Sequence, residues 1–196
     1  MIGIVNYGAG NIFSLTAALD RIQVSYGMIH TQDDFEKYSH IIIPGVGHAG
    51  AAMQKLQDTG LVDTILGLKK PVLGICVGMQ LLTSFSEEGH ADLLNIFPLK
   101  TLHFDKRINE KVPHMGWNSV SIENNSPLFK NIPDNTYFYF VHSYFIEREL
   151  DTVAASCNYG LSFAAAIQKD NFYGVQFHPE KSGEHGEQLL LNFSRF

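Results

Sequence analysis

The chain has 196 residues, enough for one domain with a sizeable core, and we expect residues 1–196 to form a single domain. Hydrophobic residues make up 45% of the sequence and charged residues 17%, a composition that excludes an intrinsically disordered chain. The formal net charge is −6 and no basic stripe is visible, which argues against nucleic acid as a partner. The two cysteines, Cys76 and Cys157, form no C-x-x-C pair and so give no support for a disulfide framework or a thiolate zinc site.

The first five residues predict a strand and carry none of the charged and apolar regions of an export signal. The longest apolar runs fall far short of the roughly 20 residues that a membrane-spanning helix needs. We therefore expect no membrane segment and a cytoplasmic location, where reducing conditions keep a reactive thiol usable.

The N-terminal half alternates between short apolar runs and helical patterns. Strands are predicted at 2–5, 24–30, 40–44 and 71–76, and helices at 11–21 and 50–69, the second of which Gly60 could interrupt. Uniformly apolar strands that alternate with helices predict a mostly parallel sheet of the flavodoxin or Rossmann kind, with helices on both faces. The active site of such a sheet lies outside the carboxyl ends of its strands.

The C-terminal half is richer in aromatic and β-branched residues separated by turn residues. This composition predicts additional antiparallel or mixed strands at 101–104, 118–122, 136–146, 152–157, 163–168 and 172–177. A helix is predicted at 184–193, at the end of the chain.

A single cysteine stands where the strand at 71–76 passes into the next helix. Gly74 lies two residues before Cys76 and Gly78 two residues after it, as a strained strand-to-helix corner requires. This is the nucleophile-elbow arrangement with sulfur in place of oxygen, and the helix terminus that follows favours thiolate over thiol. The alternative is a buried core cysteine in a strand punctuated by glycine.

His178 is the best candidate for the base that a cysteine nucleophile needs. It ends an apolar strand, and Glu180 follows two residues later, on the same side of an extended chain. A carboxylate so placed can orient the imidazole and leave its other nitrogen free to face a thiol. The alternative is a strand-end histidine with a routine backbone hydrogen bond.

Acyl transfer also requires donors for a developing oxyanion. One candidate is the backbone N–H of Val77, the residue after Cys76. The other is the Pro-Gly-Val-Gly loop at 44–47, which otherwise is a tight turn after a strand. Cys157 has no flanking glycine and no nearby base, so we interpret it as a packed thiol.

The motifs at 74–80 and 177–180 resemble those of the class I (triad) glutamine amidotransferases. Four further motifs, at 6–11, 44–47, 111–118 and 140–144, narrow the resemblance to the glutaminase subunits of imidazole glycerol phosphate synthases. Together these motifs extend over essentially the whole chain. One segment departs from the family pattern, because residues 91–98 lack the glycines that usually form a turn there, which puts the local strand geometry in doubt.

The resemblance implies a role for each matching position. Cys76 would be the nucleophile that forms a glutamyl thioester, His178 the general acid and base, and Glu180 its orienting carboxylate. Residues implied in binding the glutamine head group are Gln80 and Glu88, with the backbone of His142, Ser143 and Tyr144; those implied in the oxyanion hole are Val77, Val46 and Gly47. No metal and no organic cofactor is implied.

The resemblance further implies a heterodimer with a (β/α)8-barrel cyclase subunit. This partner would use the ammonia to form imidazole glycerol phosphate and an aminoimidazole carboxamide ribotide in histidine biosynthesis. Asn11, Trp117 and Lys181 would face it, although a lone tryptophan can also be a core residue and a lysine is often only solvated.

Three other functions stay open at this point. The chain could supply ammonia to a different synthase, for example one that amidates sugars for surface polysaccharides. It could instead be a cysteine hydrolase that needs no partner, or a binding module on a catalytically dead scaffold. The Pro-Gly-Val-Gly loop and the His-Met-Gly-Trp-Asn motif at 114–118 argue against the hydrolase, and the intact Cys76, His178 and Glu180 argue against the dead scaffold.

Overall fold

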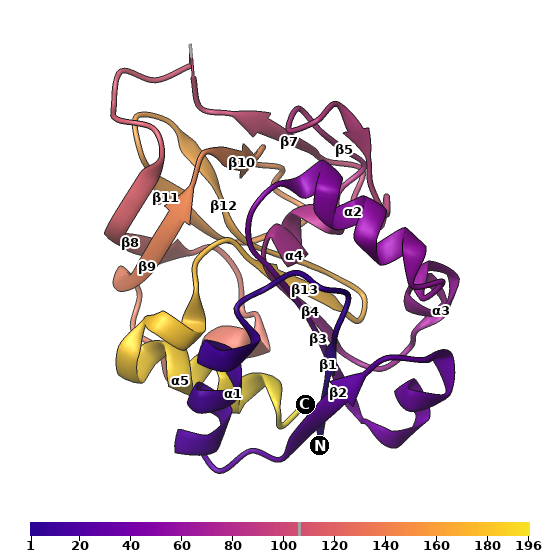
Figure 1. Cartoon of the computed structure of the whole chain (residues 1–196). Coiled ribbons are helices and arrows are strands. Elements are labelled where there is room, and N and C mark those ends of the chain that lie inside the picture. Colours follow the sequence, from indigo (N-terminus) through magenta and orange to yellow (C-terminus); the bar gives the residue numbers. More distant parts are fainter. Residues whose placement is uncertain (106) are drawn as a thin grey trace.

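A computed structural model, which describes residues 1–105 and 107–196, has a parallel sheet at its centre (Figure 1). Its strands are β1 (Ile2–Val5), β2 (Tyr26–Ile29), β3 (His40–Gly45), β4 (Val72–Cys76) and β13 (Phe172–Val175). They lie in the order β2-β1-β3-β4-β13, and each neighbouring pair is parallel. The predicted mostly parallel sheet is thus confirmed, and it brings the carboxyl ends of β1, β3, β4 and β13 to one edge.

Helices cover both faces of this sheet. They are α1 (Ile12–Arg21), α2 (Ala49–Asp58), α3 (Val62–Gly67), the short α4 (Val77–Leu81) and α5 (Gly183–Phe193). Figure 1 shows α1 and α5 on one side of the parallel strands and α2 to α4 on the other. The predicted helix at 50–69 breaks at Gly60, whose φ of 70° lies in the left-handed region that favours glycine.

The C-terminal half extends the sheet with largely antiparallel strands. From β13 the sheet continues through β12 (Ser162–Lys169), β10 (Tyr144–Ile146), β7 (Lys100–His103), β5 (Phe85–Ser86) and β6 (Ala91–Asp92). A branch runs from β12 through β11 (Val153–Asn158) and β8 (His114–Ile122) to β9 (Thr136–His142). Three 3₁₀ turns complete the described elements: η1 (Gln32–Lys37), η2 (Pro127–Phe129) and η3 (Pro179–Lys181).

The structure differs from the predicted elements in three places. The strand predicted at 136–146 is interrupted at Ser143, because the chain crosses there from the β8–β9 branch to the branch that holds β7 and β12. Strand β8 begins at His114, four residues before the predicted start at Asn118. The two-residue strands β5 and β6, the second of them in the atypical 91–98 segment, pair with each other, and neither was predicted from the sequence.

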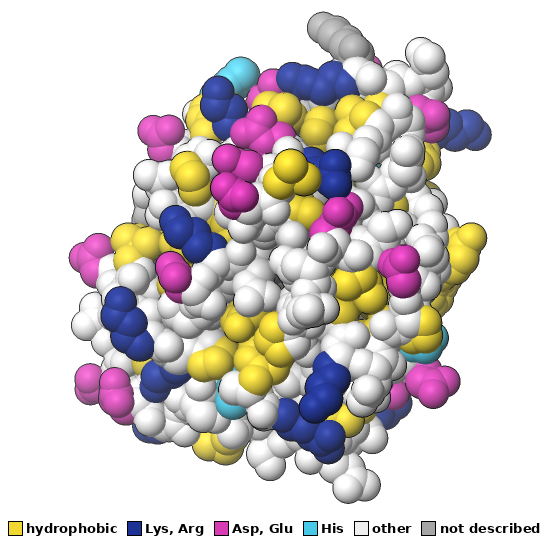
Figure 2. All heavy atoms as spheres, turned by 180° about the vertical axis from the view of Figure 1, so that it is seen from behind, with side chains coloured by type: hydrophobic (Ala, Val, Ile, Leu, Met, Phe, Trp, Pro, Cys, Tyr) yellow, Lys and Arg dark blue, Asp and Glu magenta, His cyan; other side chains and the backbone are white. Residues whose placement is uncertain are grey.

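The core is continuous across both halves, and every residue of β1, β3, β4 and β13 is buried. On the face shown in Figure 2, acidic and basic side chains are interspersed rather than gathered by sign. Among the described residues, no helix has both the length and the apolar character needed to cross a membrane.

Candidate active site

Cys76 stands at the corner between β4 and α4 with a φ of 54°, a strained value for a residue that is not glycine. The backbone around the corner is packed too tightly for side chains. A Cβ on Gly74 would lie 2.5 Å from the carbonyl oxygen of Gly78, and a Cβ on Gly78 would overlap the carbonyl oxygen of Ile43. The two flanking glycines are therefore steric requirements of the corner, and they let α4 begin directly against β3.

His178 and Glu180 form a buried pair at the end of β13. Nδ1 of His178 lies 2.8 Å from Oε1 of Glu180, and the side chains are only 2% and 4% exposed. The His178 N–H donates to the Tyr139 carbonyl on β9, and within the turn the Ser182 hydroxyl donates to the His178 carbonyl at 2.6 Å. The backbone N–H of Tyr139 in turn donates to the Ser182 oxygen at 2.9 Å. The turn that carries His178 is thus bonded to β9, and Glu180 bonds one nitrogen of the imidazole.

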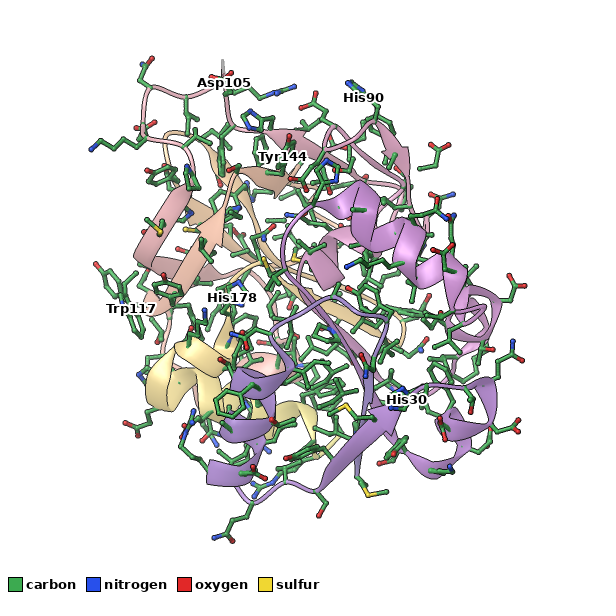
Figure 3. All side chains as sticks on the ribbon, in the orientation of Figure 1. His30, His90, Asp105, Trp117, Tyr144 and His178 are labelled. Carbon is green, nitrogen blue, oxygen red and sulfur yellow. The ribbon has the colours of Figure 1, made fainter. Side chains whose placement is uncertain are left out.

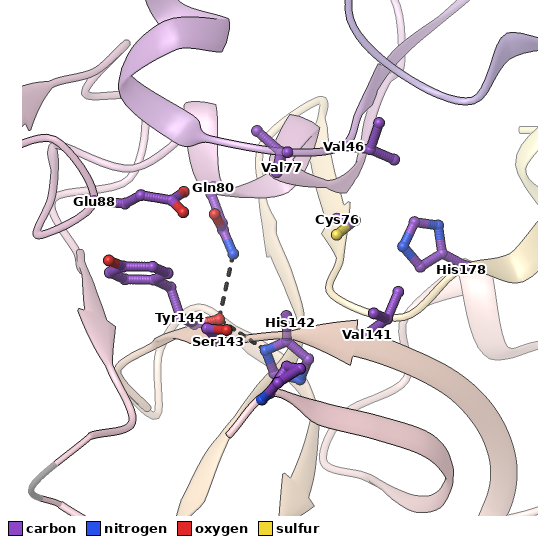
Figure 4. A pocket seen from close by; sticks show the side chains of 12 residues that line it. Val46, Cys76, Val77, Gln80, Glu88, Val141, His142, Ser143, Tyr144 and His178 are labelled. Carbon is purple, nitrogen blue, oxygen red and sulfur yellow. Dashed lines mark hydrogen bonds between the residues drawn. The ribbon is translucent and has the colours of Figure 1, made fainter. Parts of the chain in front are cut away.

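The neighbours of His178 determine the protonation of its imidazole. Burial works against a charged imidazole, but the Cys76 sulfur and the Glu180 carboxylate outweigh it and raise the pKa of His178 to about 10. Within the described residues, Nε2 of His178 has no hydrogen-bond partner. Figure 4 shows the imidazole beside the Cys76 sulfur. The arrangement suits a thiolate–imidazolium pair.

A cavity of about 320 Å³ opens at this edge of the sheet (Figure 4). Its lining residues are Val46, Gly47, Cys76, Val77, Gln80, Glu88, Pro113, Val141, His142, Ser143, Tyr144 and His178. The structure thus brings together all the residues that the sequence suggested for catalysis, oxyanion binding and substrate binding except Glu180. Glu180 lies behind His178 and, with Asn11, lines a small neighbouring hollow.

The end of the cavity away from His178 is polar. The Glu88 carboxylate accepts a bond from the backbone N–H of Ala49 at 2.6 Å, which fixes it at the start of α2. Gln80, on α4, donates through Nε2 to the Tyr144 carbonyl at 3.3 Å. Figure 4 shows Gln80 and Glu88 side by side across from Tyr144. A carboxylate and an amide oxygen here could accept from an ammonium group.

Two residues beside Cys76 were not singled out in the sequence. The side-chain amide of Gln176, which is fully buried, donates to the Cys76 sulfur at 3.7 Å. The Tyr7 hydroxyl donates to the Pro44 carbonyl at 2.6 Å, and burial together with the nearby Cys76 raises the pKa of Tyr7. Gln176 could have been found, because it lies two residues before His178 and an extended chain points both to the same side. No local signal marked Tyr7.

A pair of buried histidines, His114 and His142, lies at the cavity wall. Nδ1 of His114 is 2.9 Å from Nε2 of His142, and Nδ1 of His142 is 2.7 Å from the Tyr144 carbonyl. Burial lowers the pKa of His114 to about 4. Burial also lowers the pKa of His142 to about 3, against the Tyr144 carbonyl, which raises it. Both rings are therefore neutral at pH 7, and they support the wall rather than carry charge.

The residues suggested for a partner surface lie on two neighbouring parts of the molecule. Trp117, on β8, is 55% exposed and packs edge-on against Tyr139 with ring centroids 6.2 Å apart. The Lys181 ammonium lies 5.9 Å from the centroid of the same Tyr139 ring. Figure 3 shows Trp117 at the rim and His178 in the interior. Asn11 caps α1, its side-chain oxygen accepting from the Ser14 N–H at 3.2 Å.

The described residues contain no group of three or more histidine, cysteine, aspartate or glutamate side chains placed to hold a metal ion. Cys76 and Cys157 are both free thiols. Burial raises the pKa of Cys157 to about 12, in keeping with its interpretation as a packed thiol.

The corner cysteine, the histidine–glutamate pair and the largely parallel sheet define a class of protein. The chain belongs to the class I glutamine amidotransferase family, which matches residues 4–195. Among curated proteins it is 47% identical, over 98% of its own length and 96% of the relative's, to imidazole glycerol phosphate synthase subunit HisH of Haemophilus influenzae. It is 45% identical to the HisH subunit of Bacteroides thetaiotaomicron, over 98% and 97% of the two chains.

Solved structures agree on the fold. A structure described as a glutamine amidotransferase aligns with a TM-score of 0.75 at 14% identity, over 98% of this chain and 96% of that one. A glutamine amidotransferase from Thermotoga maritima gives a TM-score of 0.66 at 16% identity, over 98% and 81% of the two chains. These likenesses show a shared fold.

Proposed function

We propose that this chain hydrolyses L-glutamine to glutamate and ammonia and passes the ammonia to a (β/α)8-barrel cyclase that forms imidazole glycerol phosphate in histidine biosynthesis. The observation that carries the proposal is the strained Cys76 beside a buried His178 whose other nitrogen is bonded to Glu180 at 2.8 Å. The full-length similarity to HisH subunits supports the choice of synthase. The free thiol of Cys76 suits a reducing cytoplasm.

In the first step the Cys76 thiolate attacks the side-chain carbonyl carbon of glutamine. A carbon–sulfur bond forms, and the carbonyl electrons move to oxygen. As the tetrahedral intermediate collapses, the carbon–nitrogen bond breaks and the His178 imidazolium protonates the leaving nitrogen, releasing ammonia. His178 then takes a proton from water, which attacks the glutamyl thioester. Glutamate leaves, and the thiolate–imidazolium pair is restored.

The oxyanion would bind to the Val77 N–H and to a peptide of the 44–47 loop. Gly45 fixes the start of this loop, because a Cβ there would lie 2.5 Å from the backbone nitrogen of Gly78. Beyond it the loop is open: Val46 is 41% exposed, and Gly47 has a φ of 88° with free space around it. We infer that a peptide at Val46 and Gly47 turns toward the cavity when the second donor is needed.

The amino-acid head group of glutamine would bind at the polar end of the cavity. The Gln80 amide nitrogen donates to both Tyr144 and Gln176, which leaves its side-chain oxygen as an acceptor. This oxygen and the Glu88 carboxylate would accept from the α-ammonium group. The backbone of His142, Ser143 and Tyr144 would complete the pocket and orient the side-chain amide toward Cys76.

The cyclase would dock over the rim that carries Trp117 and Lys181. The exposed apolar side chains on β8, β9 and α1 support such an interface: Phe13 is 82% exposed, Met115 66% and Tyr137 60%. Apolar and aromatic groups at this density are typical of a protein contact. Asn11, at the start of α1, would lie at the edge of the same surface.

The replacement Cys76→Ala tests the chemistry. It should abolish glutamine-dependent synthesis in the complex with the cyclase while ammonia-dependent synthesis and complex formation persist, because only the nucleophile is lost. Glutamate release and product formation are measured with each nitrogen source. Glutamine turnover that survives in this variant would overturn the role of Cys76.

The choice of synthase and the loop movement need a separate test. We expect glutamate release by the purified chain to be nearly undetectable and to rise when the barrel cyclase and its acceptor substrate are added. Full activity of the isolated chain would contradict the loop movement and favour a hydrolase without a partner. Failure to restore growth of a histidine auxotroph, with glutaminase chemistry intact, would indicate a different synthase.

A further inference from the structure

Gln176 is a buried polar residue that the triad chemistry does not use. It follows β13, two residues before His178, and its side chain is fully buried. One end contacts the nucleophile, since Nε2 lies 3.7 Å from the Cys76 sulfur. The other end contacts the substrate pocket, since Oε1 accepts from Nε2 of Gln80 at 3.1 Å. A buried amide held between these two groups calls for an explanation.

The orientation of this amide is fixed by a backbone carbonyl. The Tyr144 oxygen can only accept, so Gln80 has to present its amino group there. The same amino group meets the side chain of Gln176, which therefore presents its oxygen to Gln80. The Gln176 amino group is then left to face the Cys76 sulfur. The hydrogen bonds from Gln80 to Tyr144 and Gln176 therefore determine that the Gln176 amino group, and not its oxygen, faces the Cys76 sulfur.

The sulfur needs such a donor because Cys76 is 4% exposed and little water can reach it. His178 supplies charge on one side. The Tyr7 hydroxyl is already bonded to the Pro44 carbonyl, so it is not free to donate to the sulfur. A hydrogen bond to an anion is stronger than one between neutral groups. An amide is also neutral and keeps its N–H groups at every pH at which the protein is folded.

We propose that Gln176 is a positioning residue whose side-chain amide donates a hydrogen bond to the Cys76 thiolate and holds the sulfur opposite His178, with Gln80 and the Tyr144 carbonyl fixing its orientation. This proposal deepens the proposed function and rests on it for the role of Cys76 as nucleophile. The titratable groups around the sulfur and the adjoining cavity are His178, Glu180, Tyr7, Glu88, His142 and Tyr144.

The test measures the rate at which iodoacetamide alkylates Cys76 across a range of pH. This probe reacts with thiolate and needs neither glutamine nor a partner, so the result does not depend on glutaminase activity. Peptide mass spectrometry separates Cys76 from Cys157, whose buried thiol reports whether the variant is folded. The variants are Gln176→Leu, which removes the amide, and Gln176→Glu, which can still accept from Gln80 but has no N–H for the sulfur.

We expect Gln176→Leu to raise the pH midpoint of Cys76 alkylation by about one unit, the scale set by one hydrogen bond to a charged group. Gln176→Glu should raise it further, because a carboxylate also repels the thiolate. The matched amide-to-carboxylate control is Gln57→Glu on the exposed face of α2, which should leave the midpoint unchanged. Unchanged midpoints in both Gln176 variants, with Cys157 protected, would overturn the proposal.

If the Gln176 variants do not fold, a measurement that leaves Gln176 in place tests its contact with the Cys76 sulfur. The Gln176 side-chain amide protons should shift in NMR spectra with the same pH midpoint as Cys76 alkylation. Cys76→Ala should abolish this shift. Amide protons that do not move over the range in which Cys76 becomes reactive would equally refute the contact.

Discussion

Two buried side-chain pairs in this molecule contain histidine, and the charge of the imidazole differs between them. His178 has its Nδ1 bonded to a carboxylate and its other nitrogen beside a sulfur, and its pKa is raised to about 10. His114 and His142 are bonded to one another at 2.9 Å, and their pKa values are lowered to about 4 and about 3. All three rings are almost fully buried. Burial alone therefore does not determine the charge of an imidazole; its partners do.

The neutral pair shows how this works in detail. The Tyr144 carbonyl takes the Nδ1 proton of His142, so Nε2 of His142 accepts from His114. Nε2 of His114 in turn accepts from the Asn118 amide at 3.2 Å. Every proton has an acceptor only while both rings are neutral, and a further proton would put two donors face to face. The partners of His178 favour its protonated form, whereas the partners of His114 and His142 favour the neutral form.

The largest expected effect comes from removing the carboxylate of the charged pair. Glu180→Gln should lower kcat for glutamine by roughly 10³-fold, because a neutral amide no longer orients and stabilises the imidazolium. The activity should also decline at a lower pH than in the unmutated protein. In the unmutated protein His178 has a pKa of about 10, so it stays protonated, and able to protonate the leaving nitrogen, up to about that pH. Steady-state glutaminase assays of the complex across pH measure both effects.

The matched control for this change is Glu187→Gln, which removes a partly exposed carboxylate bonded to Arg21. It should leave kcat unchanged, since the ion pair lies on the surface. More than a tenth of the normal kcat in Glu180→Gln would show that Glu180 does not govern His178.

A smaller effect is expected on stability in acid. His114 and His142 stay neutral in the folded state below pH 6.5, whereas the unfolded chain binds protons there, so the free energy of unfolding should fall as the pH falls from 6.5 toward 4. At pH 5 the loss is about 2 kcal/mol for each histidine. Urea unfolding at pH 7, 6 and 5 measures it.

The variant His114→Phe should reduce this dependence on pH, because one titrating group is removed and a ring is retained between Phe140 and Tyr159. Its kcat should remain close to normal, in contrast with Glu180→Gln. An unchanged slope of stability against pH would mean that these histidines are not the source of the acid sensitivity.

The smallest effect concerns the bonds that hold the charged pair in place. Ser182→Ala removes the hydroxyl that bridges the His178 carbonyl and the Tyr139 N–H. We expect a loss of about 1–2 kcal/mol in the free energy of unfolding and a several-fold fall in kcat with little change in KM. Ser194→Ala, at the end of α5, is the matched control and should change neither value appreciably. Equal effects of the two changes would remove Ser182 from the positioning of His178.

The sequence alone was sufficient where a local pattern has a single physical solution. Glycines on both sides of Cys76 allow the corner, and the spacing of two residues puts Glu180 beside His178. The uniformly apolar strands predicted the parallel sheet. These features depend on residues close together in the chain.

What escaped prediction depends on contacts between distant strands. The pairing of His114 with His142 requires β8 and β9 to form a hairpin in one particular register. The role of Gln176 depends on Gln80, 96 positions away, and on a carbonyl exposed where the chain crosses at Ser143. The short strand β6 has two residues and leaves no periodic pattern. Side-chain networks of this kind are fixed by tertiary packing rather than by local preference.

The place of β13 has a consequence for the order of folding. It lies between β4 and β12 and pairs with β4 across about 100 positions, from Val72 with Phe172 to Ile75 with Val175. Contacts at such a separation carry a large loop-closure entropy cost, so we expect them to form after the local units. During synthesis the strand that carries Cys76 is complete long before His178 emerges. The growing chain therefore carries an isolated thiol, and Cys76 gains His178 as a neighbour only when the last strand enters the middle of the sheet.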